Sequence, residues 1–314
     1  MNKKPLITII TPFFNSQLHL ESTIKSALFQ TYENLEFILV DDGSKDDSFK
    51  IANSFRDRRI KIIQQENKGQ CAATNVALKQ AQGEYIQFLD SDDIMSPDKT
   101  ENQFNSLVKH EGKSLGVSKW AFFNLYIEDA FFSAEPVFKS TDPIDWLCTL
   151  MSNDTMMHTN SYLIPRSILE KGGSYFNESL ALNVDLEFFT RMALASDHID
   201  YCETALSYYR KGVKGSKTYS PSISKQQSAL KARTLAIQNL LSKENSERTR
   251  EASRMAITLL TFSYPKLLKD SKVELEKLNL NYFSNFQGKY FGILVSIFGI
   301  EHAIRLRGIY SRFL

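Results

Sequence analysis

The chain has 314 residues, of which 42% are hydrophobic and 24% charged, and its formal net charge is +2. This composition is typical of a soluble globular protein with one large domain and an appendage, or with two domains. The near-neutral charge gives no reason to expect a nucleic-acid partner. Three widely spaced cysteines fit neither a disulfide framework nor a zinc site, and we expect a reducing, cytoplasmic location. No signal-peptide pattern and no bilayer-spanning apolar run is found in the sequence.

The first hundred residues alternate between strand and helix patterns. A continuous β-branched run at 6–10 predicts a strand buried on both faces, and mainly apolar runs predict further strands at 35–40, 60–63 and 85–89. Apolar residues at helical spacing predict helices between them, at 20–28, 46–55 and 69–80. This alternation predicts an α/β fold with a Rossmann-type, mainly parallel sheet flanked by helices. In such sheets, ligands bind beyond the carboxyl ends of the strands.

The remaining sequence predicts a second, mixed half and a helical tail. Strands are expected at 117–126 and 160–164, and helices at 142–151, 185–195, 226–241, 248–262 and 273–280. The segment 211–224 is rich in Gly, Ser, Lys and Pro and predicts a loop or domain junction. We therefore expect one domain at 1–220, with halves at 1–110 and 111–220, and a C-terminal helical extension at 221–314.

An acidic cluster follows the fourth predicted strand, at Asp90, Ser91, Asp92 and Asp93. Clustered carboxylates repel one another and resist desolvation, and a hard divalent cation such as Mg²⁺ or Mn²⁺ offsets that cost. Residues two apart in an extended segment point to the same side, so Asp90 and Asp92 can face one ion. We predict a cation site that holds a phosphorylated substrate; the alternative is a solvated acidic turn.

Polar and aromatic residues also follow the other strands. Asp42 can accept hydrogen bonds from a base or ribose, although its neighbours can equally cap the next helix. Phe14 can stack on a nucleobase or belong to the core. Lys68 opens the third helix, where backbone amides favour phosphate.

Several motifs, in order along residues 5–99, resemble those of the family 2 glycosyltransferases, which have the GT-A fold. They are 9–15 (IITPFFN), 26–32 (SALFQTY), 40–44 (VDDGS), 67–69 (NKG), 72–75 (AATN) and 83–93 (GEYIQFLDSDD). The resemblance implies that 1–110 is the nucleotide-sugar-binding half and that Asp92 and Asp90 face a divalent cation, Mn²⁺ or Mg²⁺. It also implies contacts to the donor, most commonly a UDP-sugar, from Thr11, Pro12, Phe14, Asp42, Lys68, Asp90 and Ser91. Thr74 stands where many members carry Arg, so a diphosphate contact is missing or supplied by Lys68.

A looser resemblance continues downstream, at 173–180 (GSYFNESL) and 184–189 (VDLEFF). It implies that 111–220 is the acceptor and catalytic half and that Asp185 is the catalytic base of an inverting transfer. Val184 stands where members usually have Glu, and Asp185 can also be read as an ordinary first-turn acid of a helix. The implied acceptor is a saccharide or a lipid-linked saccharide, in cell-surface polysaccharide synthesis.

Three further features have two interpretations each. His158 can line the acceptor cleft or be structural, and Arg210, Lys214 and Lys217 can close over the diphosphate or stay solvated. The segment 290–314 combines an apolar run with arginines, so it can bind the inner face of the cell membrane or pack on the preceding helices.

Two other functions remain open. Val184 and Thr74 are compatible with an inactive nucleotide-sugar-binding protein. Paired acids after a parallel strand also occur in receiver-like signalling domains, but such a domain leaves the Asp185 region and the tail unexplained.

Overall fold

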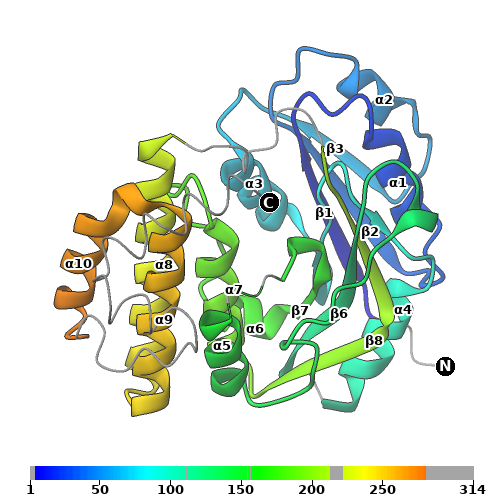
Figure 1. Cartoon of the computed structure of the whole chain (residues 1–314). Coiled ribbons are helices and arrows are strands. Elements are labelled where there is room, and N and C mark those ends of the chain that lie inside the picture. Colours follow the sequence, from blue (N-terminus) through cyan, green and yellow to red (C-terminus); the bar gives the residue numbers. More distant parts are fainter. Residues whose placement is uncertain (1–3, 111, 154, 156, 213–221, 281–314) are drawn as a thin grey trace.

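The computed structural model describes residues 4–110, 112–153, 155, 157–212 and 222–280. Within them, one eight-stranded sheet has the order β3-β2-β1-β4-β7-β6-β8-β5 and is flanked by helices (Figure 1). The strands are β1 (Ile7–Phe13), β2 (Leu35–Asp41), β3 (Ile60–Gln64), β4 (Tyr85–Phe88), β5 (Ile94–Met95), β6 (Ser114–Phe123), β7 (Tyr162–Pro165) and β8 (His198–Arg210). The expected α/β fold is confirmed.

The first four strands form one parallel part of the sheet, and β6 and β8, which are also parallel, form another. Strands β3, β2, β1 and β4 are parallel neighbours, as their alternation with helices predicts. Strand β7 runs antiparallel to both β4 and β6, and the short β5 runs antiparallel to β8. The whole sheet is therefore mixed, and ligands are expected at the carboxyl ends of its first four strands.

The helices lie on both faces of the sheet and in a separate layer. They are α1 (Leu20–Leu28), α2 (Ser48–Ser54), α3 (Gln70–Gln80), α4 (Lys99–Leu107), α5 (Pro143–Ser152), α6 (Arg166–Lys171), α7 (Val184–Ala195), α8 (Ile223–Lys243), α9 (Glu247–Ser263) and α10 (Leu268–Lys277). The last three lie side by side, beyond α5 and α7 as seen from the sheet (Figure 1).

Two hydrophobic clusters form the core, one on each face of the sheet. In β1, Ile7 and Ile9 belong to the cluster that includes α1 and α4, whereas Ile10 belongs to the cluster that includes α3 and α7. This division follows the alternation of side chains along a strand. The second of these clusters extends to Leu230 of α8 and Ile257 of α9, so the C-terminal helices share a core with the sheet. The boundary that we expect at residue 220 stays a prediction.

Some helices and strands have other bounds than expected, some were not expected, and some predicted sites lie outside the described residues. The predicted strand at 117–126 begins three residues earlier, at Ser114, and the last predicted helix begins at Leu268. Strand β8 and helices α4 and α6 were not predicted. Lys214, Lys217 and the segment 290–314 lie outside the described residues.

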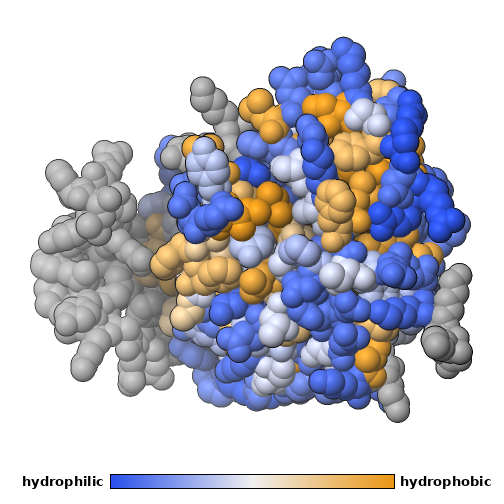
Figure 2. Space-filling model, turned by 90° about the vertical axis from the view of Figure 1, so that its right-hand side faces the viewer, coloured by the Kyte–Doolittle hydropathy of each residue, from blue (hydrophilic) through white to orange (hydrophobic). Residues whose placement is uncertain are grey.

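In the described part of the chain, no helix is both long and apolar enough to cross a bilayer. On the side of α1, α2 and α4, hydrophobic residues form separate patches among hydrophilic ones (Figure 2).

Candidate active site

Asp93 anchors the acidic turn that follows β4. Its carboxylate accepts hydrogen bonds from the Nδ2 atom of Asn160, at 2.9 Å, and from the backbone N–H of Arg210, at 3.0 Å. Burial raises the pKa of Asp93 well above its usual range, and the charges of Asp92 and Asp90 raise it further. Both of its oxygens are therefore used inside the protein, and Asp93 holds the turn in place.

Arg210 holds the same turn from the end of β8. Its Nε donates to the carbonyl oxygen of Asp92, at 2.9 Å, and its Nη1 donates to that of Asn124, at 3.1 Å. Its guanidinium lies 4.3 Å from the ring centroid of Phe123. These contacts give Arg210 a role in positioning the acidic turn, while its contact with a diphosphate stays a prediction.

Asp92 and Asp90 are the two residues of the acidic turn that we expect to bind a divalent cation. Burial raises the pKa of Asp92, and the charge of Arg210 only partly opposes this. The Oδ1 atom of Asp90 accepts a hydrogen bond from the Nε2 of Gln70, at 3.0 Å. A desolvated carboxylate beside a second one is stabilised by a cation. The described residues contain no group of three or more His, Cys, Asp or Glu side chains suited to a metal. Mg²⁺ commonly uses only one or two carboxylates, with waters and substrate phosphates as its other ligands, so this pair fits.

Asp42 organises the loop on the nucleotide side of the site. Its carboxylate accepts hydrogen bonds from the Nε2 of Gln65, at 2.7 Å, and from the backbone N–H groups of Lys68 and Gly69, each at 2.8 Å. A carboxylate has about four acceptor positions, so roughly one remains for a ligand. Asp42 therefore shapes the loop in addition to any contact with a base or ribose.

Phe14 lies at an open hollow beside this loop. The residue is 46% exposed, and it lines the hollow together with Gly43, Lys45 and residues 64–67. A Cβ atom at Gly43 would lie 3.0 Å from the backbone nitrogen of Asn67, and Gly43 has a φ of +77°. A glycine is thus needed where the loop after β2 meets the loop after β3.

The other residues expected to contact the donor differ in how far their side chains are buried. Thr11 is buried in β1, where its hydroxyl has no hydrogen-bond partner among the described residues. The hydroxyl of Ser91 lies 2.8 Å from that of Ser16. The side chain of Lys68 is exposed. Their contacts with a donor remain predictions.

Asp185 lies in the first turn of α7. Asn183, two residues before it, is the N-cap of this helix. Its backbone is left-handed, with a φ of 56°, which asparagine tolerates better than most residues. Burial raises the pKa of Asp185, while nearby backbone N–H groups and the charge of Arg233 oppose the rise. A carboxylate with a raised pKa is a stronger base than an ordinary one.

One small cavity connects the two ends of the candidate site. Its walls include Asp90, from the acidic turn, and Asp185, from α7. Pro12, Thr74 and Val184 line the same cavity. Thr74 and Val184, the two residues that depart from the expected motifs, therefore line the same cavity as Asp90 and Asp185.

Tyr209 precedes Arg210 in β8, and no sequence motif singles it out. Burial raises its pKa to about 12, and further contributions come from the charges of Asp93, Asp90, Asp92 and Asp185. Tyr209 is thus a buried phenol whose pKa responds to the charges of the acidic turn and of Asp185. Tyr209 belongs to β8, a strand that was not predicted, so no sequence signal placed it here.

His158 belongs to an aromatic cluster beside Tyr209. Their ring centroids are 3.9 Å apart in a stacked arrangement, and Trp120 meets His158 edge-on at 4.4 Å. Burial lowers the pKa of His158 to about 3, and the charge of Lys211 contributes. His158 is therefore neutral at physiological pH, and its packing favours the structural interpretation over a place in the acceptor cleft.

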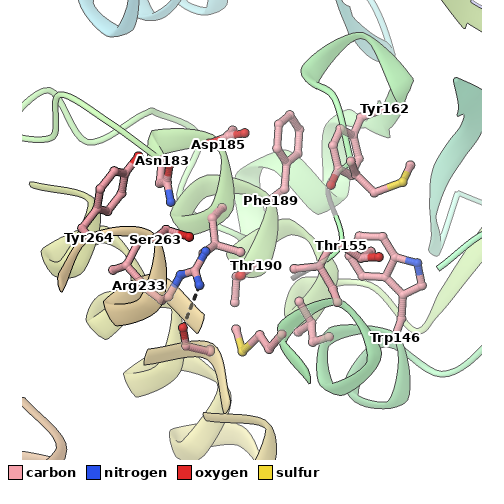
Figure 3. A pocket seen from close by; sticks show the side chains of 17 residues that line it. Trp146, Thr155, Tyr162, Asn183, Asp185, Phe189, Thr190, Arg233, Ser263 and Tyr264 are labelled. Carbon is pink, nitrogen blue, oxygen red and sulfur yellow. Dashed lines mark hydrogen bonds between the residues drawn. The ribbon is translucent and has the colours of Figure 1, made fainter. Parts of the chain in front are cut away.

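Asp185 also lines a second, larger cavity, between α5, α7, α8 and α9 (Figure 3). Its volume is about 220 Å³. Asp185 thus lies between two cavities, one on the side of the acidic turn and one on the side of the C-terminal helices.

Comparison with known proteins supports the motifs on which the resemblance rests. The model of the family described as "Glycosyl transferase family 2" matches residues 8–123. The chain is 34% identical over 199 residues to the uncharacterized glycosyltransferase RT0329 of Rickettsia typhi, a match that covers 63% of this chain and 62% of that protein. The chain spans less than two thirds of the length of the curated relatives that it matches.

Two solved structures share the fold. TarS of S. aureus, residues 1–349 in complex with UDP-GlcNAc, has a TM-score of 0.66 at 20% identity, and the match covers 88% of this chain and 76% of that one. The mannosyltransferase PcManGT of Pyrobaculum calidifontis, in complex with GDP-Man and Mn²⁺, has a TM-score of 0.58 at 16% identity, covering 99% of this chain and 81% of that one. These similarities confirm the expected GT-A-like fold.

Proposed function

Because this chain belongs to glycosyltransferase family 2, we propose that it transfers a sugar from a nucleotide-diphosphate sugar to an acceptor hydroxyl. The observation that carries the proposal is the small cavity whose walls include both Asp90 and Asp185. This arrangement brings a carboxylate suited to a cation and a carboxylate suited to proton removal to the same space. The acceptor that we propose is a saccharide or lipid-linked saccharide of a cell-surface polysaccharide.

The donor side extends from Asp42 and Phe14 to the acidic turn. We propose that the exposed ring of Phe14 stacks on the base and that the remaining acceptor position of Asp42 binds the base or ribose. Thr11, Pro12, Lys68 and Ser91 complete the proposed donor site. A uridine donor is favoured because the structural neighbour TarS is in complex with UDP-GlcNAc.

Asp185 is the proposed general base of an inverting single displacement. Its carboxylate removes the proton of the acceptor hydroxyl while the oxygen attacks the anomeric carbon from the face opposite the leaving diphosphate. The raised pKa of Asp185 increases its proton affinity, while the charge of Arg233 favours its ionised state before the reaction. Holding the two substrates in line supplies much of the remaining acceleration.

Asp92 and Asp90 are the proposed ligands of a divalent cation. When bound, Mn²⁺ or Mg²⁺ stabilises the negative charge that develops on the departing nucleoside diphosphate. Asp93 and Arg210 hold the turn that carries these two residues. These contacts hold the backbone from which both side chains extend, and this supports the proposal.

Asp92→Ala tests this assignment through donor binding. We expect the affinity for UDP-GlcNAc in the presence of Mn²⁺ to fall at least tenfold, because one cation ligand is lost. Isothermal titration calorimetry with and without Mn²⁺ measures this, and a thermal-shift panel of nucleotide sugars identifies a better donor if one exists. The exposed Asp129→Ala is the matched control. Unchanged Mn²⁺-dependent affinity in Asp92→Ala contradicts the cation site.

An inactive nucleotide-sugar-binding protein is the second candidate. It is favoured by the position of Val184 and Thr74, which line the small cavity in place of the residues usual in the family. Such a protein binds the donor with Mn²⁺ but transfers its sugar neither to water nor to any acceptor, so no nucleoside diphosphate is released. A coupled assay for UDP release distinguishes the two functions.

A further inference from the structure

The larger cavity beside Asp185 has walls from two parts of the chain. Helices α5 and α7 contribute one side, and α8 and α9 contribute the other (Figure 3). The cavity therefore exists only because the C-terminal helices pack against α5 and α7. Neither the motifs of residues 8–123 nor the proposed donor site explains it.

Most of the cavity wall is apolar. Leu147 and Leu150 come from α5, Phe189 from α7 and Leu260 from α9. A dry, apolar protein cavity of about 150 Å³ accepts benzene, so a cavity of about 220 Å³ has room for one six-membered ring with a small substituent. The wall thus favours a compact apolar ring over a chain of hydrated sugars.

Thr190 adds a polar group to this wall. It is 1% exposed, and its hydroxyl has no hydrogen-bond partner in the described part of the chain. Arg233 reaches from α8 towards α7 in the same region, with its Nη1 donating to the carbonyl oxygen of Ala256 at 2.7 Å (Figure 3). A buried hydroxyl without a partner is unfavourable, and a polar atom on a bound molecule removes that cost.

Asp185 fixes where the reacting part of such a molecule must lie. It lines both this cavity and the small cavity that contains Asp90. A molecule held in the larger cavity can therefore place a hydroxyl at Asp185 while its ring remains between the helices.

We propose that this cavity is the acceptor subsite, and that the acceptor carries a ring-sized apolar group next to the hydroxyl that is glycosylated. This inference rests on the proposed function, because it assigns the hydroxyl to the base Asp185. Thr190 contributes specificity by binding a polar atom on the ring, and the C-terminal helices are part of the substrate site.

Binding of cyclohexanol to the full-length protein tests the cavity without any donor. We expect saturation-transfer NMR to detect binding of cyclohexanol to the wild type. In Ala256→Phe, whose new ring fills the cavity, the affinity for cyclohexanol should fall at least tenfold.

Thr190→Val keeps the shape of the side chain but removes its hydroxyl. It should weaken cyclohexanol binding about threefold to tenfold and leave benzene binding unchanged. Equal cyclohexanol binding by the wild type and a folded Ala256→Phe overturns the inference, and so does an unchanged affinity in Thr190→Val.

A transfer assay separates this inference from the proposed function. With a donor that is turned over, phenyl glycosides should be better acceptors than the matching methyl glycosides, by at least tenfold in kcat/KM, and Ala256→Phe should remove that preference. If UDP is released but phenyl and methyl glycosides react equally, the acceptor subsite is wrong while the glycosyltransferase activity stands. If the wild type binds no nucleotide sugar with Mn²⁺, the proposed function fails, and the acceptor subsite with it.

Discussion

Asp93 and Asp185 both have a raised pKa, but their surroundings give them different roles. Both oxygens of Asp93 accept hydrogen bonds, from Asn160 and from the backbone of Arg210, so this side chain is an internal anchor. Asp185 instead lines two cavities and has a cationic neighbour in Arg233. Burial alone therefore does not distinguish an anchor from the base that we propose, whereas the two cavities beside Asp185 support that proposal.

The substitution Asp185→Asn tests this role at the level of one residue. We expect kcat to fall by about 10²- to 10⁴-fold, since general-base assistance is lost, while donor affinity stays unchanged. In the wild type, kcat should fall as the pH decreases through the pKa of Asp185, which lies above the usual range of aspartate. Steady-state kinetics across pH and donor titrations measure both effects. The exposed Asp197→Asn serves as the control, and a kcat in Asp185→Asn within a factor of three of the wild type rules out the base assignment.

At the level of the elements, the sequence predicted the parallel half of the sheet well. Its strands are mainly apolar runs, and β1, β2 and β4 are almost entirely buried, which is a strong local signal. Strand β8 was missed because its thirteen residues mix buried and exposed positions, and its pairing with β6 shifts register after Ser118. The roles of Tyr209, Arg210 and Asn160 could not be predicted, because they depend on how β8 and the segment before β7 pack against the acidic turn.

Gly83, in the connection from α3 to β4, gives a test at this level. A Cβ atom at this position would lie 2.5 Å from the backbone nitrogen of Thr8 and 2.6 Å from its Oγ1 atom. Because backbone cannot move aside cheaply, Gly83→Ala should separate the connection from β1 and destabilise the fold by roughly 2–4 kcal/mol. Urea unfolding followed by circular dichroism measures this, with the neighbouring Gln82→Ala as the control. A Gly83→Ala protein as stable as that control contradicts the close approach.

At the level of the whole molecule, the sheet, α7 and the C-terminal helices share one hydrophobic cluster. Groups buried near the acids therefore influence the stability of the entire fold. His158 is such a group, because burial lowers its pKa to about 3 from the ordinary 6.5. The unfolded chain takes up a proton there below about pH 6.5, whereas the folded protein does not until about pH 3.

The free energy of unfolding should therefore decrease as the pH falls from 6.5 towards 3. Urea titrations of the wild type at several pH values measure this decrease. A group whose folded pKa is depressed contributes about 1.4 kcal/mol per pH unit over that window, so His158 alone should cost roughly 2–3 kcal/mol between pH 6.5 and 4.5. Asp93 and Asp185, whose pKa values are raised, act in the opposite direction. The comparison must therefore be with His158→Phe, which should lose less stability over the same interval in urea titrations. Parallel curves for the two proteins would falsify the assignment.

The place of Asp185 in the wall of two cavities has a consequence for inhibitor design. A bisubstrate compound, with a nucleoside diphosphate joined by a short linker to a cyclohexyl or phenyl ring, would pass over this carboxylate and occupy both spaces at once. Since the second contact then becomes intramolecular, its affinity would exceed that of either fragment by orders of magnitude. The selectivity of such a compound would come from the ring, because its pocket is built by helices outside the shared family motifs.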